Sequence, residues 1–454
     1  MAIQTLNPAT GKSVKTFTPH TDAQVDLAIG KSVVAHHALR DLSFGERSKL
    51  MNAAADILNK ETDDFAAIMT LEMGKTFKAA KAEAEKCAFV CRYYAKHAES
   101  LLADESVETD ASKAFRAYLP LGPVLAVMPW NFPFWQAMRF AAPALMAGNT
   151  GLLKHAANVP QCALALEDIF ARAGFPDGAF QTLLIGGDKV ERVLRDDRVV
   201  AATLTGSEPA GSAVAKTCGE LIKPVVLELG GSDAFIVMPS ADLDKAVKVG
   251  TLARTINNGQ SCIAAKRFIV HADVYDDFKD KLAAAFKNLK VGNPMKDDTD
   301  IGPLSGKSAL ETITSQVNAA VKAGAVRVCG AQAIDGAGFF FTPGILENIP
   351  EDAPVYSEEI FGPVALLFKV NSIKDALALA NDSPFGLGGS IFTNDKAEQE
   401  MAIRELQAGA TFINSATASD PRLPFGGIKR SGFGRELSRE GIRAFCNVKT
   451  VSIA

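Results

Sequence analysis

The stretch NNGQSCIAAKR, residues 257–267, places Cys262 after a polar turn that contains glycine and before a run of small residues. Most cysteines in a globular chain are small apolar residues packed in a core. A nucleophilic cysteine needs a local group that favours the thiolate, and in hydrolases that group is usually a histidine. The six histidines are His20, His36, His37, His97, His155 and His271. None of them forms a recognisable cysteine–histidine signature, although a distant histidine can fold onto Cys262, so packing and catalysis both remain open for this residue.

Three further segments carry polar residues where chemistry is possible. Asn131 follows the apolar run LGPVLAVMPW, and its amide can donate a hydrogen bond to a developing oxyanion. Glu228 is the only acid in the apolar segment PVVLELGG. It either points outward from an edge strand or is buried, in which case its pKa is raised and it suits a general base. Ser207, in TGSEPAG, lies between a strand and a helix, where free backbone N–H groups can hold a phosphate.

The elements that must position these residues alternate between strand and helix. Two helical segments, 22–42 and 44–75, precede the apolar run at 121–130. Strand-like NTGLLKH, VAATLTGS and KPVVLELGG then alternate with helical PQCALALEDIFARAG and EPAGSAVAKTCGE. This alternation predicts an α/β fold with a parallel sheet covered on both faces. A second alternating block begins near residue 232, which indicates a second α/β domain.

Composition narrows the class of protein. A chain of 454 residues is long enough for two or three domains. Its net charge of −4 and its lack of long charged or apolar runs argue against nucleic-acid and membrane partners, and we expect a cytosolic protein that acts on small molecules. The seven cysteines are scattered and odd in number, which argues against a disulfide framework and against a zinc site or other metal site. Cys87 and Cys91 are expected to pack on one face of a helix.

Taken in order, seven motifs resemble those of the aldehyde dehydrogenase superfamily: PWNFP, LLKHAANVP, TLTGSEPAG, LELGGSD, GQSC, EEIFGP and PFGGIKRSGFGRE. The resemblance implies a Rossmann-like dinucleotide-binding domain, an α/β catalytic domain and a small β projection that joins subunits. The expected bounds are 1–108 with 123–231, then 232–425, and for the projection 109–122 with 440–454. A homodimer or homotetramer is expected, because FRAYLPL and VKTVSIA read as strands whose exposed edges need a partner.

The resemblance also implies catalytic roles. Cys262 is expected to be the nucleophile, and Asn131 together with the Cys262 backbone N–H is expected to hold the oxyanion. Glu228 is expected to activate the water that hydrolyses the thioester. The presence of Glu228 argues against the rival activity, transfer of the acyl group to coenzyme A, and the three residues together argue against a binding protein that lost its chemistry. Because Ala264 stands where several relatives have a second cysteine, a local disulfide cannot protect Cys262, and we expect a thiolate that is sensitive to oxidation.

Cofactor contacts carry over from the same motifs. The residues that resemble cofactor-binding positions of the family are Trp130, Lys154, Ser207, Glu359 and Phe361. Three residues after Lys154 the family often has a glutamate that binds ribose hydroxyls and would repel a 2′-phosphate, whereas this chain has Ala157. With that negative charge absent and with Lys154 and His155 nearby, we expect NADP to be preferred over NAD.

The expected substrate is an aldehyde that carries a carboxylate. An arginine in a mainly apolar funnel is costly unless it meets an anion, so Arg139, eight residues after Asn131, suggests a substrate carboxylate. Arg139 and Ser419, in the loop that precedes Phe425, resemble residues of family members that oxidise succinate semialdehyde. A second arginine of those enzymes is replaced here by Ile256. A structural role for Arg139, with oxidation of other aliphatic or aromatic aldehydes, is the alternative.

Overall fold

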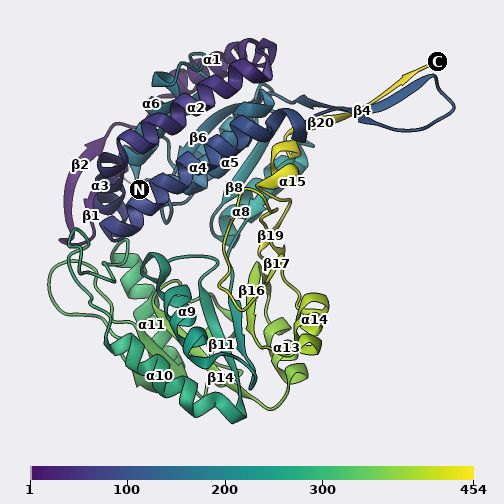
Figure 1. Ribbon diagram of the computed structural model, residues 1–454. Helices are drawn as coiled ribbons and strands as arrows, with labels where there is room; N and C mark the ends of the chain where they lie inside the picture. Colours follow the sequence, from purple (N-terminus) through teal and green to yellow (C-terminus); the bar gives the residue numbers. More distant parts are fainter. Residues whose placement is uncertain (1–2) are drawn as a thin grey trace.

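The computed structural model describes residues 3–454 and contains two sheets of parallel strands with helices around them, shown in Figure 1. The helices are α1 (Asp22–Asp41), α2 (Phe44–Lys60), α3 (Thr62–Met73), α4 (Phe77–Leu101), α5 (Trp135–Ala147), α6 (Pro160–Arg172), α7 (Val190–Leu194), α8 (Glu208–Glu220), α9 (Leu243–Thr255), α10 (Tyr275–Lys287), α11 (Lys307–Ala323), α12 (Pro354–Ser357), α13 (Ile373–Asn381), α14 (Lys396–Glu405) and α15 (Ser438–Arg443). Short 3₁₀ turns are η1 (Gly187–Lys189), η2 (Ile256–Gly259) and η3 (Ala272–Val274). The α/β fold expected from the alternating pattern is confirmed.

The strands within residues 3–454 form five sheets. They are β1 (Ile3–Asn7), β2 (Lys12–Phe17), β3 (Glu105–Ser106), β4 (Lys113–Pro120), β5 (Pro123–Met128), β6 (Thr150–His155), β7 (Phe180–Thr182), β8 (Ala201–Thr205), β9 (Val225–Glu228), β10 (Asp233–Val237), β11 (Ala265–His271), β12 (Val326–Cys329), β13 (Gly344–Glu347), β14 (Val364–Val370), β15 (Phe385–Gly386), β16 (Gly388–Phe392), β17 (Ala410–Ile413), β18 (Ile428–Lys429), β19 (Gly432–Phe433) and β20 (Cys446–Ile453).

The first large sheet has the strand order β19-β9-β8-β5-β6-β7. Five of these strands run parallel, and β19 pairs antiparallel with β9 at one edge. Each of the five ends at the same edge of the sheet, so the polar residues that follow β5, β6, β8 and β9 are brought to one side.

The helices of this half begin and end where their sequences predict. Thr21 and Ser43 each close a capping box at the start of α1 and α2. The helical segment 44–75 forms two helices rather than one, because Glu61 leaves the helical backbone conformation and α3 then starts at Thr62. Cys87 and Cys91 are buried on α4, as expected.

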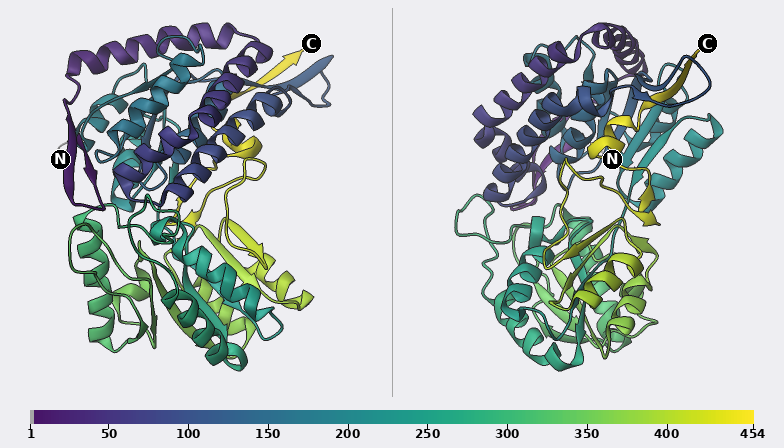
Figure 2. Two further views of the ribbon diagram at one scale, coloured as in Figure 1. Left: turned by 60° about the vertical axis from the view of Figure 1, so that its left-hand side comes forward. Right: turned by 45° about the vertical axis from the view of Figure 1, so that its right-hand side comes forward.

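The second large sheet has the order β12-β13-β14-β11-β10-β16-β17 and is parallel except for β12. The chain passes from the first sheet to the second between Glu228 and Asp233. Figure 2 shows the two halves one above the other, with the yellow C-terminal segment running back from the lower half to the upper one. That return adds β19 to one edge of the first sheet and places α15 against α5, so the site receives residues from both halves.

A third, smaller sheet projects from the body of the molecule (Figure 1). It has the order β20-β4-β3, and β4 pairs with β20 over their full lengths. The two strands expected from FRAYLPL and VKTVSIA are therefore confirmed, although residues 438–443 form α15 before β20 begins. No helix among residues 3–454 is long and apolar enough to cross a membrane.

Candidate active site

Cys262 follows a turn whose backbone is left-handed at three consecutive residues. The φ angles are 55° at Asn257, 58° at Asn258 and 77° at Gly259, a region that asparagine and glycine tolerate best. Gly259 also lies so close to the neighbouring segment that an added Cβ would stand 2.3 Å from the carbonyl carbon of Gly362. The NNG sequence before Cys262 is therefore required by the shape of the turn.

The side chains of Asn258 and Lys266 hold this turn in place by hydrogen bonds. The Asn258 amide donates to the carbonyl oxygens of Gly74 (2.9 Å) and Pro303 (3.0 Å). The buried Lys266 ammonium donates to the carbonyl oxygens of Ser261 (2.7 Å) and Cys262 (2.6 Å). These hydrogen bonds fix the turn, and with it the position of Cys262 relative to its surroundings.

Asn131 is tied to the same turn. Its side-chain N–H donates to the carbonyl oxygen of Gln260 at 3.2 Å, and the Asn257 amide donates to the Asn131 carbonyl at 2.7 Å. The Asn131 side-chain oxygen has no hydrogen-bond partner among residues 3–454. The structure therefore brings together Asn131 and the residues that precede Cys262, as the oxyanion hypothesis requires, and leaves the second amide N–H for another acceptor.

Glu228 ends β9 and is 2% exposed, so the outward-facing alternative for this residue is wrong. Strands β8 and β19 flank it, because the chain returns to cover what would otherwise be the sheet edge. Neither carboxylate oxygen has a hydrogen-bond partner among the described residues. Burial, and then the nearby Glu436 carboxylate, raise the pKa of Glu228 well above its usual value, whereas Arg139 lowers it.

Cys262 faces a cavity of about 250 Å³ that lies between α4, α5, the Cys262 turn and the loop 414–427. Three of the expected substrate residues, Arg139, Ser419 and Phe425, line this cavity together with Cys262. Its remaining walls are mainly apolar and include Phe132, Trp135 and Ile256 among others. An enclosed apolar site with a few polar groups around a thiol is suited to a small organic substrate.

Arg139 is not free in this cavity. It is 2% exposed, its Nε pairs with the Glu436 carboxylate, and its guanidinium carbon lies 4.5 Å from the Phe425 ring centroid. A further N–H donates to the Thr205 hydroxyl at 3.3 Å. The Arg139 guanidinium, which was expected to bind a substrate carboxylate, already has a carboxylate partner. The sequence did not reveal this partner, because Glu436 lies in a glycine-rich motif far along the chain.

The expected cofactor residues gather at the carboxyl edge of the first sheet. Lys154 lies near the end of β6 and is half-buried, and within residues 3–454 no hydrogen bond or ion pair engages its ammonium. Ser207 is the N-cap of α8, yet its side chain makes no capping hydrogen bond. Position 157, three residues after Lys154, is an alanine and supplies no carboxylate. Burial lowers the pKa of Lys154, although the Asp188 carboxylate is near enough to raise it. A free ammonium and free helix N–H groups suit a phosphorylated ribose and a pyrophosphate.

His155 does not contribute to that charge, and the expectation that it favours a 2′-phosphate is wrong. Its ring nitrogens lie 2.8 Å from the Pro133 carbonyl oxygen and 3.2 Å from that of Met128. Burial lowers its pKa to about 4, so the ring is neutral near pH 7.

Trp130, Phe361 and Glu359 complete the cofactor side. The rings of Trp130 and Phe361 meet edge to face with centroids 5.7 Å apart. The Glu359 carboxylate lies 2.9 Å from the Lys266 ammonium, which itself holds the Cys262 carbonyl. The turn before Cys262 and Glu359, the expected ribose-binding acid, thus both contact the ammonium of Lys266.

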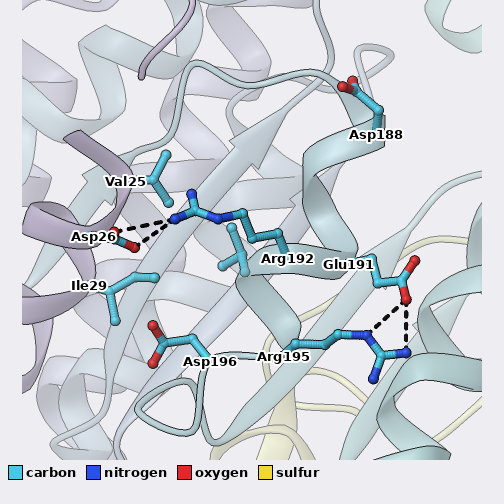
Figure 3. Close-up of a pocket in the computed structure, with 9 residues that line it drawn as sticks. Val25, Asp26, Ile29, Asp188, Glu191, Arg192, Arg195 and Asp196 are labelled. Carbon is cyan, nitrogen blue, oxygen red and sulfur yellow. Dashed lines mark hydrogen bonds and ion pairs between the residues drawn. The ribbon is translucent and has the colours of Figure 1, made fainter. Parts of the chain in front are cut away.

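Another hollow, of about 470 Å³, lies between α1 and α7 (Figure 3). Arg192 donates to both Asp26 oxygens at 3.2 Å, and Arg195 donates to Glu191 at 2.9 Å. Because both of its arginines have carboxylate partners among residues 3–454, this hollow offers no unpaired positive charge to an anionic ligand. Among residues 3–454, no cluster of histidine, cysteine or acidic residues has the arrangement of a metal site.

Comparison with known proteins agrees with this geometry. The family described as "Aldehyde dehydrogenase family" matches residues 1–451. The chain belongs to the aldehyde dehydrogenase family. A protein of Mycobacterium tuberculosis (strain ATCC 25618 / H37Rv) named succinate-semialdehyde dehydrogenase [NADP(+)] 1 is 58% identical over 457 residues, which cover 100% of both chains. A probable succinate-semialdehyde dehydrogenase [NADP(+)] of Synechocystis sp. is 57% identical over 454 residues, again with 100% of each chain covered.

Solved structures are similar over the whole length of the chain. The succinic semialdehyde dehydrogenase of Streptococcus pyogenes, solved in complex with NADP+, is 40% identical, has a TM-score of 0.97, and matches with 100% of both chains covered. This likeness establishes the aldehyde dehydrogenase fold for the present chain.

In this aldehyde dehydrogenase the surroundings of Cys262, the expected nucleophile, favour the thiol over the thiolate. Burial raises the pKa of Cys262 to about 12, although the positive charges of Lys266 and Arg139 act in the opposite direction. The expectation of a preformed thiolate is therefore not supported by the free site. Nucleophilic attack by Cys262 would require this thiol to lose its proton.

Sequence reasoning missed three residues of this aldehyde dehydrogenase site: Lys86, Lys266 and Glu436. Lys86, on α4, lines the cavity and donates to the Ser419 hydroxyl at 2.7 Å. Lys86 gave no signal, because a lysine in an amphipathic helix is usually solvated. The other two residues stood close to features that the sequence analysis had named. Lys266 lies four residues after Cys262, and Glu436 lies inside the GFGRE motif.

Proposed function

We propose that this protein oxidises succinate semialdehyde to succinate with NADP as the hydride acceptor. The observation that carries the proposal is the small cavity in which Cys262 and basic side chains line the same walls. Relatives of the same length, 58% identical, carry the name of this activity. An apolar wall with a positive charge inside it favours an aldehyde that bears a carboxylate over an uncharged one.

The first step is the attack of Cys262. Its thiol gives a proton to solvent water, the sulfur forms a bond with the aldehyde carbon, and the carbon–oxygen π bond breaks so that the carbonyl oxygen becomes an oxyanion. The Asn131 amide and the Cys262 backbone N–H donate to that oxyanion. Bound NADP supplies the acceptor for the hydride that leaves the same carbon, and a thioester on Cys262 remains.

Glu228 acts in the second step. Its carboxylate takes a proton from water, the water oxygen bonds to the acyl carbon, and the carbon–sulfur bond breaks. Succinate leaves and the Cys262 sulfur is released. A buried carboxylate with a raised pKa is a stronger base than an exposed one, which suits this role.

Lys154 and Ser207 are proposed to hold the 2′-phosphorylated ribose and the pyrophosphate. Glu359 is proposed to accept hydrogen bonds from the nicotinamide ribose, with Trp130 and Phe361 beside the ring. The free Lys154 ammonium and the absence of an acid at Ala157 support NADP. Ser419 and Phe425 are proposed as substrate contacts, since both line the cavity. Arg139 contacts a substrate carboxylate only by exchanging it for Glu436.

The projecting sheet is proposed to join two copies of this chain, as a homodimer or within a homotetramer. In the pairing of β4 with β20, Leu119, Phe115, Val451 and Ile453 share one face with Lys113, Asn447 and Lys449, and Leu119 and Ile453 are 42% and 48% exposed. Exposed apolar side chains and an open strand edge on a sheet that stands away from the body favour a partner in water. The seven free cysteines support a reducing compartment, the cytosol.

The test compares kcat/KM with NADP for succinate semialdehyde and for butyraldehyde. We expect the semialdehyde to be preferred by about tenfold or more, the value of one charge-assisted contact. Equal values would mean that the enzyme oxidises aldehydes without a carboxylate requirement.

Two variants test the chemistry separately from the substrate. Cys262→Ala removes the nucleophile and should abolish oxidation of both aldehydes. Glu228→Gln keeps the shape but not the base, so one equivalent of NADPH should appear as a burst followed by slow turnover. Unchanged steady-state turnover would exclude Glu228 as the base.

A further inference from the structure

Lys86 is a cation of the cavity that has no carboxylate partner among residues 3–454. It lies on α4, half-buried, and its ammonium donates to the Ser419 hydroxyl at 2.7 Å and lies 4.1 Å from the Trp135 ring centroid. No carboxylate within residues 3–454 forms an ion pair with it, whereas Arg139 on the same cavity pairs with Glu436. The two basic residues of the cavity therefore differ in what they can offer to an anion.

The acids nearest to Lys86 are already engaged. Glu83, one turn earlier on α4, accepts hydrogen bonds from the backbone N–H groups of Phe134 and Trp135, each at 2.9 Å, and pairs with the buried Lys75. Asp420, in the loop 414–427, is held by Arg422 at its side chain and backbone. Neither is free to neutralise Lys86.

A buried ammonium without a counter-ion is costly, and an anion that enters the cavity removes that cost. Ser419 fixes the position of the ammonium, so the binding geometry exists before substrate arrives. An ammonium offers three donors, of which the Ser419 contact uses one. Lys86, Ser419 and Cys262 line one cavity, which allows an aldehyde at the sulfur and an acid group at the amine within one small molecule.

We propose that the Lys86 ammonium, positioned by Ser419, binds the carboxylate of the substrate and sets the preference for aldehydes that carry an acid group. Arg139 then organises the cavity wall through Glu436. This inference rests on the proposed function, since it assigns the carboxylate of that substrate to a named residue.

The ionisation of Lys86 gives the inference a second consequence. Charged and titratable groups that face its amine are Arg139 of α5, Glu83 and Cys87 of its own helix, and Asp420 of the neighbouring loop. Burial, and then Arg139, lower the pKa of Lys86 to about 8. The ammonium is present below that pH and is lost as pH rises through it, so affinity for an acidic aldehyde should fall above about pH 8.

The experiment compares wild type, Lys86→Met, Lys86→Arg and the matched control Lys96→Met, an exposed lysine on the same helix. For each, kcat and KM are measured with saturating NADP for succinate semialdehyde and for butyraldehyde, and the thermal midpoint is recorded to show that the variant is folded. In Lys86→Met we expect KM for the semialdehyde to rise on the order of tenfold to a hundredfold, and KM for butyraldehyde to change much less, because butyraldehyde has no carboxylate for the ammonium to bind.

The ratio of kcat/KM for the two aldehydes is measured as a function of pH. Ionisation of Cys262 affects both substrates equally and therefore cancels in this ratio. In wild type this ratio should fall above about pH 8. In Lys86→Arg it should stay flat there, because a guanidinium keeps its charge.

Three results would overturn the inference. They are an unchanged semialdehyde KM in Lys86→Met, an equal loss for both aldehydes in a folded Lys86→Met, and the same KM rise in Lys96→Met. In each case a wild type that still prefers the semialdehyde leaves the proposed function intact. A wild type without that preference would overturn the proposed substrate itself.

Discussion

The guanidinium of Arg139 on α5 pairs with the carboxylate of Glu436, 2% and 5% exposed respectively, at the wall of the cavity that contains Cys262. Glu436 also raises the pKa of Glu228, the proposed base, and Arg139 lowers it. One buried ion pair therefore connects the cavity beside Cys262, the C-terminal return of the chain and the proposed base Glu228.

Replacing Arg139 by Met should destabilise the protein. Glu436 would remain buried without its partner, which costs about 3 to 5 kcal/mol in comparable pairs. Adding Glu436→Gln to Arg139→Met removes the stranded charge and should recover more than half of the loss. Thermal and urea unfolding of the two single variants and the double variant measure this coupling. A double variant no more stable than Arg139→Met would mean that the two residues do not stabilise each other.

Glu436→Gln should shift the pH dependence of turnover. Burial and the Glu436 charge raise the pKa of Glu228, so the base is in its active carboxylate form only on the alkaline side. Without Glu436 the Glu228 pKa falls, and the rising limb of kcat should move to lower pH, with a gain of roughly threefold or more at acidic pH. Glu440→Gln, an exposed acid nearby, is the control. Movement of the limb to higher pH would contradict the assignment.

Ala157→Glu should reverse the cofactor preference. A carboxylate beside Lys154 would repel a 2′-phosphate and accept hydrogen bonds from a free ribose, so the ratio of kcat/KM for NADP over NAD should fall by about tenfold or more. Ala157→Gln has the same size without the charge and should keep most of the NADP preference. If both variants lower the ratio equally, bulk rather than charge is responsible.

Alkylation of Cys262 by iodoacetamide should depend steeply on pH. Because burial raises the pKa of this thiol to about 12, its thiolate fraction grows close to tenfold per pH unit across the neutral range. Cys262→Ala, labelled in parallel, shows how many of the other cysteines react, and that number is subtracted. The rate of inactivation of the free enzyme should then rise with pH in the same way. A rate that levels off near neutral pH would show a preformed thiolate.

Leu119→Asp should weaken subunit association. Leu119 is 42% exposed on the face of the projecting sheet that also carries Phe115 and Val451, and a buried charge at an interface without a partner is costly. Thr450→Asp lies on the opposite face of the same strand pair and serves as the control. Light scattering after size-exclusion chromatography should give a smaller mass for Leu119→Asp alone. An unchanged mass in Leu119→Asp would place the interface elsewhere.

Local features of the chain could be read from the sequence. The alternation of apolar strands and amphipathic helices determined the parallel sheets, because each pattern buries its apolar face in only one kind of element. The motif order indicated the family, and the NNG residues marked the turn before Cys262. The position of Asn131, Lys154, Ser207 and Glu228 at one sheet edge followed from the parallel topology.

Partner choice among charged side chains was decided only by the tertiary structure. Arg139 looked available for substrate until the return of the chain placed Glu436 against it. Lys86 looked like a solvated helix lysine until the loop 414–427 placed Ser419 at its amine, 333 residues away in sequence. His155 looked like a source of positive charge until burial made it neutral. Charge and burial depend on contacts between distant segments, and no local pattern encodes those contacts.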